Sequence, residues 1–243
     1  MKLRFSALLA TLVLLAAGPL RAADAVSPVL AKARAYLGSE RALNAVTTIH
    51  FTGSLEVDAA AKLPVDIVFQ KPYQQRIMVT GPKVIEVTAL DGYDAWQKRT
   101  NPANPTQWQV TLLDAGQVKR LRANTWENLS FFSGIDKKGG SVVAGGDVTV
   151  DGVACAKLSF VHADNIVFVR YFEKATGRLV KTETESGAEI REEGELIVNG
   201  VRFPRKVINK VTNGPTTIIT FDKIELNGTV AGAEFAVPAF RSN

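Results

Sequence analysis

Apolar and polar residues alternate along most of this chain with a period of two. From 47 to 57 the apolar residues Ile49, Phe51 and Leu55 alternate with polar ones. This period is typical of β-strands, whose successive side chains point to opposite faces of a sheet. The same alternation recurs in the first half at 64–70, 75–80, 84–90 and 93–98.

The second half, from 141 to 225, repeats this pattern without a helical interruption. Turn signals divide it at intervals of roughly ten to fourteen residues, the spacing of an antiparallel meander. They are Asp151-Gly152, Ala163-Asp164-Asn165, Ala175-Thr176-Gly177, Ser186-Gly187, Asn199-Gly200 and Asn213-Gly214. A sheet of about ten strands should curl. We therefore predict a mainly β (α+β) fold, a strongly curved, half-open antiparallel β-barrel or meander.

Two segments have the period of a helix instead. Ser27-Pro28 provides a capping hydroxyl and a proline at the first helical position, and Gly38 provides a stop. A second short turn begins at Ser39. In the middle of the chain, Asp114 and Gln117 form a capping-box pattern that begins a helix ending near 126. These N-terminal and central helices are too few to wrap a barrel, so we expect them to act as a lid.

The predicted inner face of the curved sheet is apolar. It carries Ile49, Phe51, Leu55, Ile67, Phe69, Ile77 and Val79 in the first half, and Val167, Val169, Leu196, Val198, Ile218 and Ile219 in the second. Such a face encloses either a filled core or a cavity that could hold an acyl chain. The expected lid or cavity contacts are Trp96, Leu121, Trp126, Phe131 and Phe132. For each of these, ordinary core packing is the alternative.

The N-terminus resembles an export signal. A basic start is followed by an apolar run at 8–17 and by a break at Gly18-Pro19. That run is too short for a transmembrane helix, which needs about 20 residues. We expect a signal peptide at 1–22, with cleavage as late as 25, and a single domain over 23–243. No cysteine near the cleavage zone could carry lipid, so the mature protein should be soluble.

Charge and cysteine content restrict the partners. Lys and Arg number 29 against 24 Asp and Glu, but three of the bases lie in the signal segment, which leaves 26 against 24. Nucleic acid is therefore an unfavoured partner. The single Cys155 cannot form an internal disulfide, and its strand pattern indicates a buried small hydrophobic residue.

No catalytic constellation is evident. His50 and His162 lie at positions typical of the surface, and no spacing suits a zinc site. Glu183 and Glu185 could share one face of a strand, but nothing desolvates them, so a solvated face is the simpler interpretation. We expect no enzyme, no metal and no cofactor.

An ordered set of local patterns resembles the periplasmic outer-membrane lipoprotein carrier and sorting family, the LolA/LolB-like proteins. The resemblance covers nearly the whole mature chain. It lies in Gly38 with Ala42-Leu43, Asp91-Gly92 with Trp96, Lys119-Arg120-Leu121, Asp151-Gly152-Val153 leading into Lys157-Leu158, Tyr171 with Gly177-Arg178-Leu179, Asn199-Gly200-Val201-Arg202-Phe203-Pro204, and Phe235-Ala236-Val237-Pro238.

This resemblance implies a half-open curved sheet closed by a helical lid over a hydrophobic cavity. It further implies a soluble periplasmic monomer that carries acyl lipid or lipoprotein between inner- and outer-membrane envelope proteins, with no cofactor. The alternative is a periplasmic sensor or scaffold of the same fold that binds an envelope protein through a sheet edge. A carrier should contain an unfilled apolar cavity, whereas a scaffold should have a packed core and an exposed apolar patch.

Overall fold

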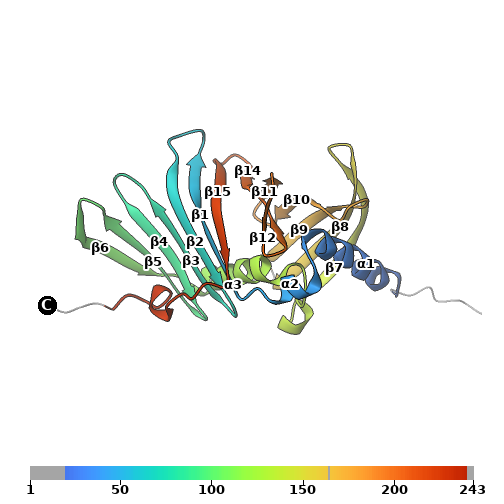
Figure 1. Ribbon diagram of the computed structural model, residues 1–243, viewed down its shortest axis with the longest axis horizontal. Coiled ribbons are helices and arrows are strands. Elements are labelled where there is room, and N and C mark those ends of the chain that lie inside the picture. The colour runs from blue at the N-terminus through green and yellow to red at the C-terminus, as the bar shows by residue number, and fades with distance from the viewer. Residues whose placement is uncertain (1–19, 164, 240–243) are drawn as a thin grey trace, which may run out of the picture.

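The structure is a computed structural model that describes residues 20–163 and 165–239. Most of the predicted signal peptide at 1–22 lies outside these residues. The described chain is mainly β, with one large antiparallel sheet and few helices (Figure 1).

The large sheet has 13 strands in the order β6-β5-β4-β3-β2-β1-β15-β14-β11-β10-β9-β8-β7. In chain order these strands are β1 (Thr48–Val57), β2 (Leu63–Gln70), β3 (Gln74–Thr80), β4 (Ile85–Asp91), β5 (Asp94–Asn101), β6 (Asn104–Leu112), β7 (Ser141–Val150), β8 (Val153–Ala163), β9 (Ile166–Glu173), β10 (Leu179–Thr184), β11 (Ala188–Glu193), β14 (Lys206–Val211) and β15 (Thr216–Leu226). A separate hairpin pairs β12 (Leu196–Val198) with β13 (Val201–Phe203).

Two meanders meet at the centre of this sheet, where β1 pairs with β15 in an antiparallel register that places Phe51 opposite Ile224. The outermost strands, β6 and β7, do not pair with each other, so the sheet stays open (Figure 1). The prediction of a curved antiparallel meander is therefore confirmed in part: the half-open barrel of about ten strands is wrong in closure and in strand count. The strand count is higher because short turns allow more strands in the same length of chain. The sheet does not need to close into a barrel, because the helices cover its inner face.

The helices are α1 (Leu20–Leu37), α2 (Glu40–Asn44), α3 (Ala115–Ser130) and the short 3-10 turns η1 (Asp136–Lys138) and η2 (Gly232–Glu234). The predicted caps of α2 and α3 are present: the Ser39 hydroxyl accepts from the Ala42 amide, and Asp114 forms a capping box with Gln117. The predicted start at Ser27 is wrong, because α1 begins earlier and continues through Pro28. Likewise α3 continues four residues beyond 126.

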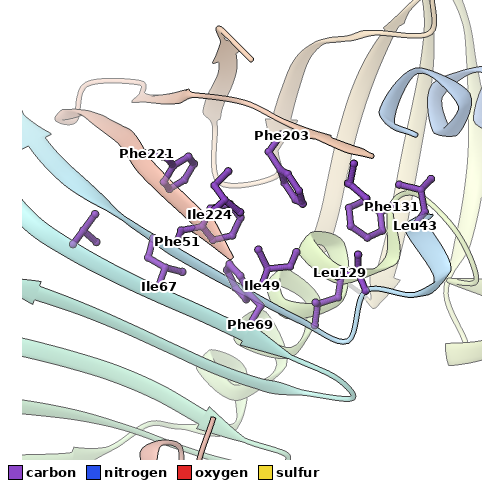
Figure 2. Close-up of a cluster of buried hydrophobic side chains, with 13 residues drawn as sticks. Leu43, Ile49, Phe51, Ile67, Phe69, Leu129, Phe131, Phe203, Phe221 and Ile224 are labelled. Atoms are coloured by element: carbon purple, nitrogen blue, oxygen red, sulfur yellow. The ribbon is translucent and has the colours of Figure 1, made fainter. Parts of the chain in front are cut away.

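The inner face of β1, β2 and β15 forms the centre of the largest apolar cluster, which Figure 2 shows. The Phe51 ring contacts Phe69, Phe203 and Phe221, with ring centroids 4.6 to 6.3 Å apart. The cluster consists of Leu43, Val46, Ile49, Phe51, Val65, Ile67, Phe69, Leu129, Phe131, Val201, Phe203, Phe221 and Ile224. Because β13 supplies Val201 and Phe203, and β12 packs against the cluster, this hairpin belongs to the cover of the sheet.

A second cluster lies under α1 and α3 at the β7 end of the sheet. Ala33 of α1 is fully buried there with Phe160 of β8 and Phe172 of β9. The prediction that Val167 and Val169 face inward is wrong, since Phe168 and Arg170 occupy the inner face of β9. Both faces of this strand are apolar, so the pattern alone could not indicate which one is the inner face.

The outer face carries a smaller covered region. On β5, Trp96 pairs with Ala89 of β4 and belongs to the face opposite the Phe51 cluster. Its Nε1 donates to the Phe235 carbonyl at 2.8 Å, and the Phe235 side chain is fully buried. The C-terminal segment around η2 therefore docks on the outside of the sheet. Cys155 is fully buried as predicted, and burial raises the pKa of its thiol.

Among the described helices, none combines the length and apolar character that crossing a membrane would require.

The junction of the two meanders depends on a glycine. A β-bulge lies at Thr52/Gly53, and a Cβ atom on Gly53 would lie 2.0 Å from the Thr220 carbonyl oxygen. We expect Gly53→Ala to lower the free energy of unfolding by about 1–3 kcal/mol, because overpacking moves the backbone. Urea unfolding measures this, with Gly228→Ala as the control, where an added Cβ contacts nothing. Equal midpoints for the two variants would contradict the packing described at this junction.

Candidate ligand-binding cavity

A cavity of about 300 Å³ lies between α3 and the inner face of the sheet. Its wall is mainly apolar, and it comes from both meanders, from α3 and from the β12–β13 hairpin. The lining residues are Leu37, Phe51, Ile67, Phe69, Ile77, Asn124, Glu127, Asn128, Phe131, Phe132, Phe168, Arg170, Leu179, Thr182, Ile190, Glu192, Arg202, Phe203, Pro204, Val207, Ile219 and Phe221. Concave sites lined by apolar side chains and a few polar groups are the usual form of small-molecule pockets.

Two phenylalanines at the end of α3 form one wall of the cavity. Phe131 and Phe132 have φ of 49° and 66°, in the left-handed region that bulky residues rarely adopt. This turn directs the two rings into different clusters: Phe131 packs on Phe203, and Phe132 packs on Phe172 at 5.0 Å between centroids. The cavity lies where the two clusters meet.

Polar contacts hold α3 above the first meander. The buried Gln75 side chain on β3 accepts at Oε1 from the Thr125 hydroxyl at 3.1 Å and from the Asn124 amide at 3.2 Å. On the outer side of the helix, the Arg122 guanidinium lies between the rings of Tyr73 and Tyr93, at 3.9 and 4.0 Å. These contacts fix the helix against the turns that join β2 to β3 and β4 to β5.

A buried carboxylate holds α3 to the second meander. Glu127, whose side chain is 4% exposed, contacts both His162 of β8 and Arg170 of β9. Arg170 is equally buried, and its guanidinium lies over the rings of Phe160, Phe168 and Phe132. His162 is therefore a packed residue, and the prediction that it lies on the surface is wrong.

Burial alone would raise the pKa of Glu127, because it disfavours the charged form. Attraction to Arg170 and His162, together with hydrogen bonds from both, outweighs burial and holds that pKa below its ordinary value. The carboxylate is thus ionised at neutral pH.

A second clamp holds the C-terminal end of α3. Arg34 of α1 donates from Nη1 to the carbonyls of Phe131 at 2.6 Å and Ser130 at 3.1 Å. Its Nε and Nη2 donate to the Glu40 carboxylate, and these bonds hold the pKa of Glu40 below its ordinary value. Helix ends leave carbonyls without partners, and a cation there is favourable. Arg34 therefore connects α1, α2 and α3 around one end of the cavity.

The residues expected from the sequence as lid or cavity contacts are only partly brought together. Phe131 and Phe132 line the cavity. Leu121 and Trp126 lie on α3 but do not line it, and Trp126 packs on Tyr73 with 6.2 Å between ring centroids. Trp96 lies on the opposite face of the sheet, under the C-terminal segment.

No local sequence pattern predicted that these charged groups would meet. Arg34, Glu127 and Arg170 come from three distant segments, so no local spacing joins them. The available signal was Glu127 at the start of a segment rich in apolar side chains, because a charge buried there needs a partner.

Over the described ranges, no group of three His, Cys, Asp or Glu side chains is placed to hold a metal ion. Both oxygens of the buried Glu127 carboxylate are already engaged, one with His162 and the other with Arg170. These contacts hold α3 to strands β8 and β9.

Comparison with solved structures identifies the fold. A DUF1329 family protein from Desulfovibrio piger aligns with a TM-score of 0.55 at 10% identity, over 87% of this chain and 97% of that one. A LolA superfamily protein from Nitrosomonas europaea gives 0.54 at 12% identity, over 87% and 97%. An outer membrane lipoprotein-sorting protein domain from Vibrio parahaemolyticus gives 0.55 at 11% identity, over 90% and 97%.

No protein-family model matches the sequence, and no curated protein matches it. At such low identities the likeness establishes the fold alone. The chain therefore has the fold of LolA superfamily and lipoprotein-sorting proteins, as the ordered sequence patterns predicted.

Replacing Glu127 tests the fastening of α3. Because the native pKa is lowered, ionised Glu127 stabilises the fold fully above the ordinary value of 4.5, and this contribution is lost as pH falls below it. We expect Glu127→Gln to cost about 3 kcal/mol at neutral pH, since Arg170 is left buried without a counter-charge. The variant should also lose part of the acid dependence below 4.5.

Urea unfolding across pH measures both effects. The matched control is Glu86→Gln, which removes an exposed pair with Arg99 and should cost less than about 1 kcal/mol. Equal losses of unfolding free energy in the two variants would contradict the buried role of Glu127.

Proposed function

We propose that this protein is a carrier-like binder of acyl chains or another hydrophobic ligand, held in the cavity beneath α3. The observation that carries the proposal is an apolar cavity of about 300 Å³ in the middle of the fold. A closely packed interior leaves few spaces larger than a water molecule, so an apolar cavity of this size is suited to an apolar ligand.

The energetics favour an apolar occupant. Each buried methylene contributes about 0.8 kcal/mol, and aromatic rings such as Phe51 and Phe168 line the space. The volume is at the low end of small-molecule pockets. A long chain therefore requires α3 to move, and the polar fastenings of α3 at Gln75 and Glu127 are the contacts that such a motion would break.

Export to the periplasm is part of this proposal. It is supported by the signal-like sequence at 1–22 and by the fold shared with a lipoprotein-sorting protein domain. Lipoprotein is accordingly one candidate cargo, and free acyl lipid is another.

A second candidate function uses the open edges of the sheet. The edge strand β6 is exposed along most of its length, and Leu112 at its end is 67% exposed. Edge strands can pair with another chain. A sensor or scaffold that binds an envelope protein through β6 would not need the cavity, so blocking the cavity separates the two functions.

Filling the cavity tests the carrier function. Val207 of β14 lines the cavity and is only partly buried. We expect Val207→Trp to occupy the space and to lower affinity for the uncharged fluorescent probe N-phenylnaphthylamine at least about ten-fold, through loss of buried apolar contact. Fluorescence titration measures this, with the exposed Val143→Trp as control. Unchanged probe affinity in a folded Val207→Trp protein would argue against the cavity as the binding site.

We also propose Phe131 and Phe132 as ligand contacts. Replacing both with Ala removes aromatic contact with the ligand, and we expect probe retention to fall more than global stability does. The matched control is Phe235→Ala, which removes a buried ring on the outer face and should reduce stability without altering probe affinity. A large loss of stability with normal probe retention would reject this assignment.

A further inference from the structure

The cavity wall is apolar on the first meander and carries three polar side chains among apolar ones on the second. Phe51, Ile67 and Ile77 line one side. On the other side, Arg170, Thr182 and Glu192 lie on the inner faces of the neighbouring strands β9, β10 and β11. Thr182 is directly opposite Arg170 on one side and Ile190 on the other, and Glu192 follows two residues after Ile190. We call Arg170, Thr182 and Glu192 the polar wall.

Each member of the polar wall has unused hydrogen-bonding capacity. Arg170 donates to Glu127 from Nη1, while its buried Nε has no hydrogen-bond partner. Within the described residues, nothing hydrogen-bonds to the Thr182 hydroxyl or forms an ion pair with Glu192, although Thr182 is only 5% exposed. On the same face, opposite Ile190, the Oδ1 of Asn209 is also buried without a partner.

Buried polar atoms without a partner, such as Arg170 Nε and Asn209 Oδ1, are rare in protein interiors, because each costs about 1–3 kcal/mol. Their position beside the unpartnered Thr182 hydroxyl, on one wall of a mainly apolar cavity, indicates that a bound molecule supplies partners there. The members of the polar wall lie together on adjacent strands, so one small polar group can reach several of them.

The positive charge of the polar wall is already balanced. Arg170 is matched by the ionised Glu127. Glu192 retains accessible surface because it lines the cavity and a small adjoining pocket, yet protein surrounds it, and this burial raises its pKa despite the attraction of Arg170. The raised pKa favours the protonated form of Glu192, which can donate a hydrogen bond, as the Thr182 hydroxyl and the guanidinium also can. An ionised ligand head would add an uncompensated charge to a low-dielectric space.

We propose that the polar wall of Arg170, Thr182 and Glu192 binds the uncharged acceptor head of an acyl ligand, such as an ester or amide carbonyl, while its chain lies against Phe51 and Ile67. This inference rests on the proposed function and narrows its ligand class. Free fatty acids and alkylamines are then poorer ligands than acyl esters of the same chain length.

The test is competition for N-phenylnaphthylamine on the full mature chain at neutral pH, with four ligands of equal chain length: dodecane, methyl laurate, lauric acid and dodecylamine. We expect methyl laurate to displace the probe about five-fold more strongly than dodecane does, the effect of one or two hydrogen bonds. Lauric acid and dodecylamine should be weaker than the ester.

Variants then assign the preference to the polar wall. The double variant Thr182→Val with Glu192→Leu should remove the preference for the ester and leave dodecane binding intact. Glu192→Gln alone should keep the preference for the ester, since the side-chain amide still donates a hydrogen bond. Glu189→Leu is the matched control, because Glu189 lies on β11 but points to the opposite face.

The outcomes separate the two proposals. Two results would overturn the polar wall as a head-group site: displacement by dodecane with no preference for the ester, or an ester preference that survives in the double variant. Either result would mean that water alone fills the polar wall, and the carrier function would stand. Failure of every ligand and of the probe itself to bind would overturn the carrier function as well.

Discussion

Glu127 joins the central helix to two strands of the second meander, and much of the interior depends on that contact. Its carboxylate lies between His162 and Arg170, with almost no exposure to solvent. Burying these charges is costly, so the group contributes to a single placement of α3 more than to stability as such. With Gln75 holding the same helix to the first meander, α3 spans the concave sheet and contacts it through Leu129. The space that remains is the cavity.

The open sheet makes such a space possible. A closed barrel of few strands would fill its interior with its own side chains, whereas this sheet has two free edges and depends on helices to cover one face. α1 and Arg34 cover one end, α3 crosses the middle, and the β12–β13 hairpin contributes Phe203. Each cover combines buried apolar contacts with a few polar ones, such as the bond from Arg34 to the Phe131 carbonyl.

Local sequence patterns predicted the strands and the helix caps, because these depend on neighbouring residues in the chain. The two-residue period located the strands, and Asp114 with Gln117 located the start of α3. Phe131 and Phe132 were identified because an apolar segment with neither period needs something to cover. Trp96 could not be placed, since the outer face of β5 is covered by a segment more than a hundred residues later in the chain. For the same reason the partnership of Glu127 with Arg170 follows only from the folded topology.

The central claim is that the interior space holds an acyl ligand. Native mass spectrometry of the mature protein, purified from periplasm without detergent and followed by organic extraction, tests it most directly. The account predicts an adduct at near one-to-one stoichiometry that yields an acyl lipid or lipoprotein on extraction. A mass equal to the bare chain, with nothing extracted and no uptake of a fluorescent acyl probe, would contradict it.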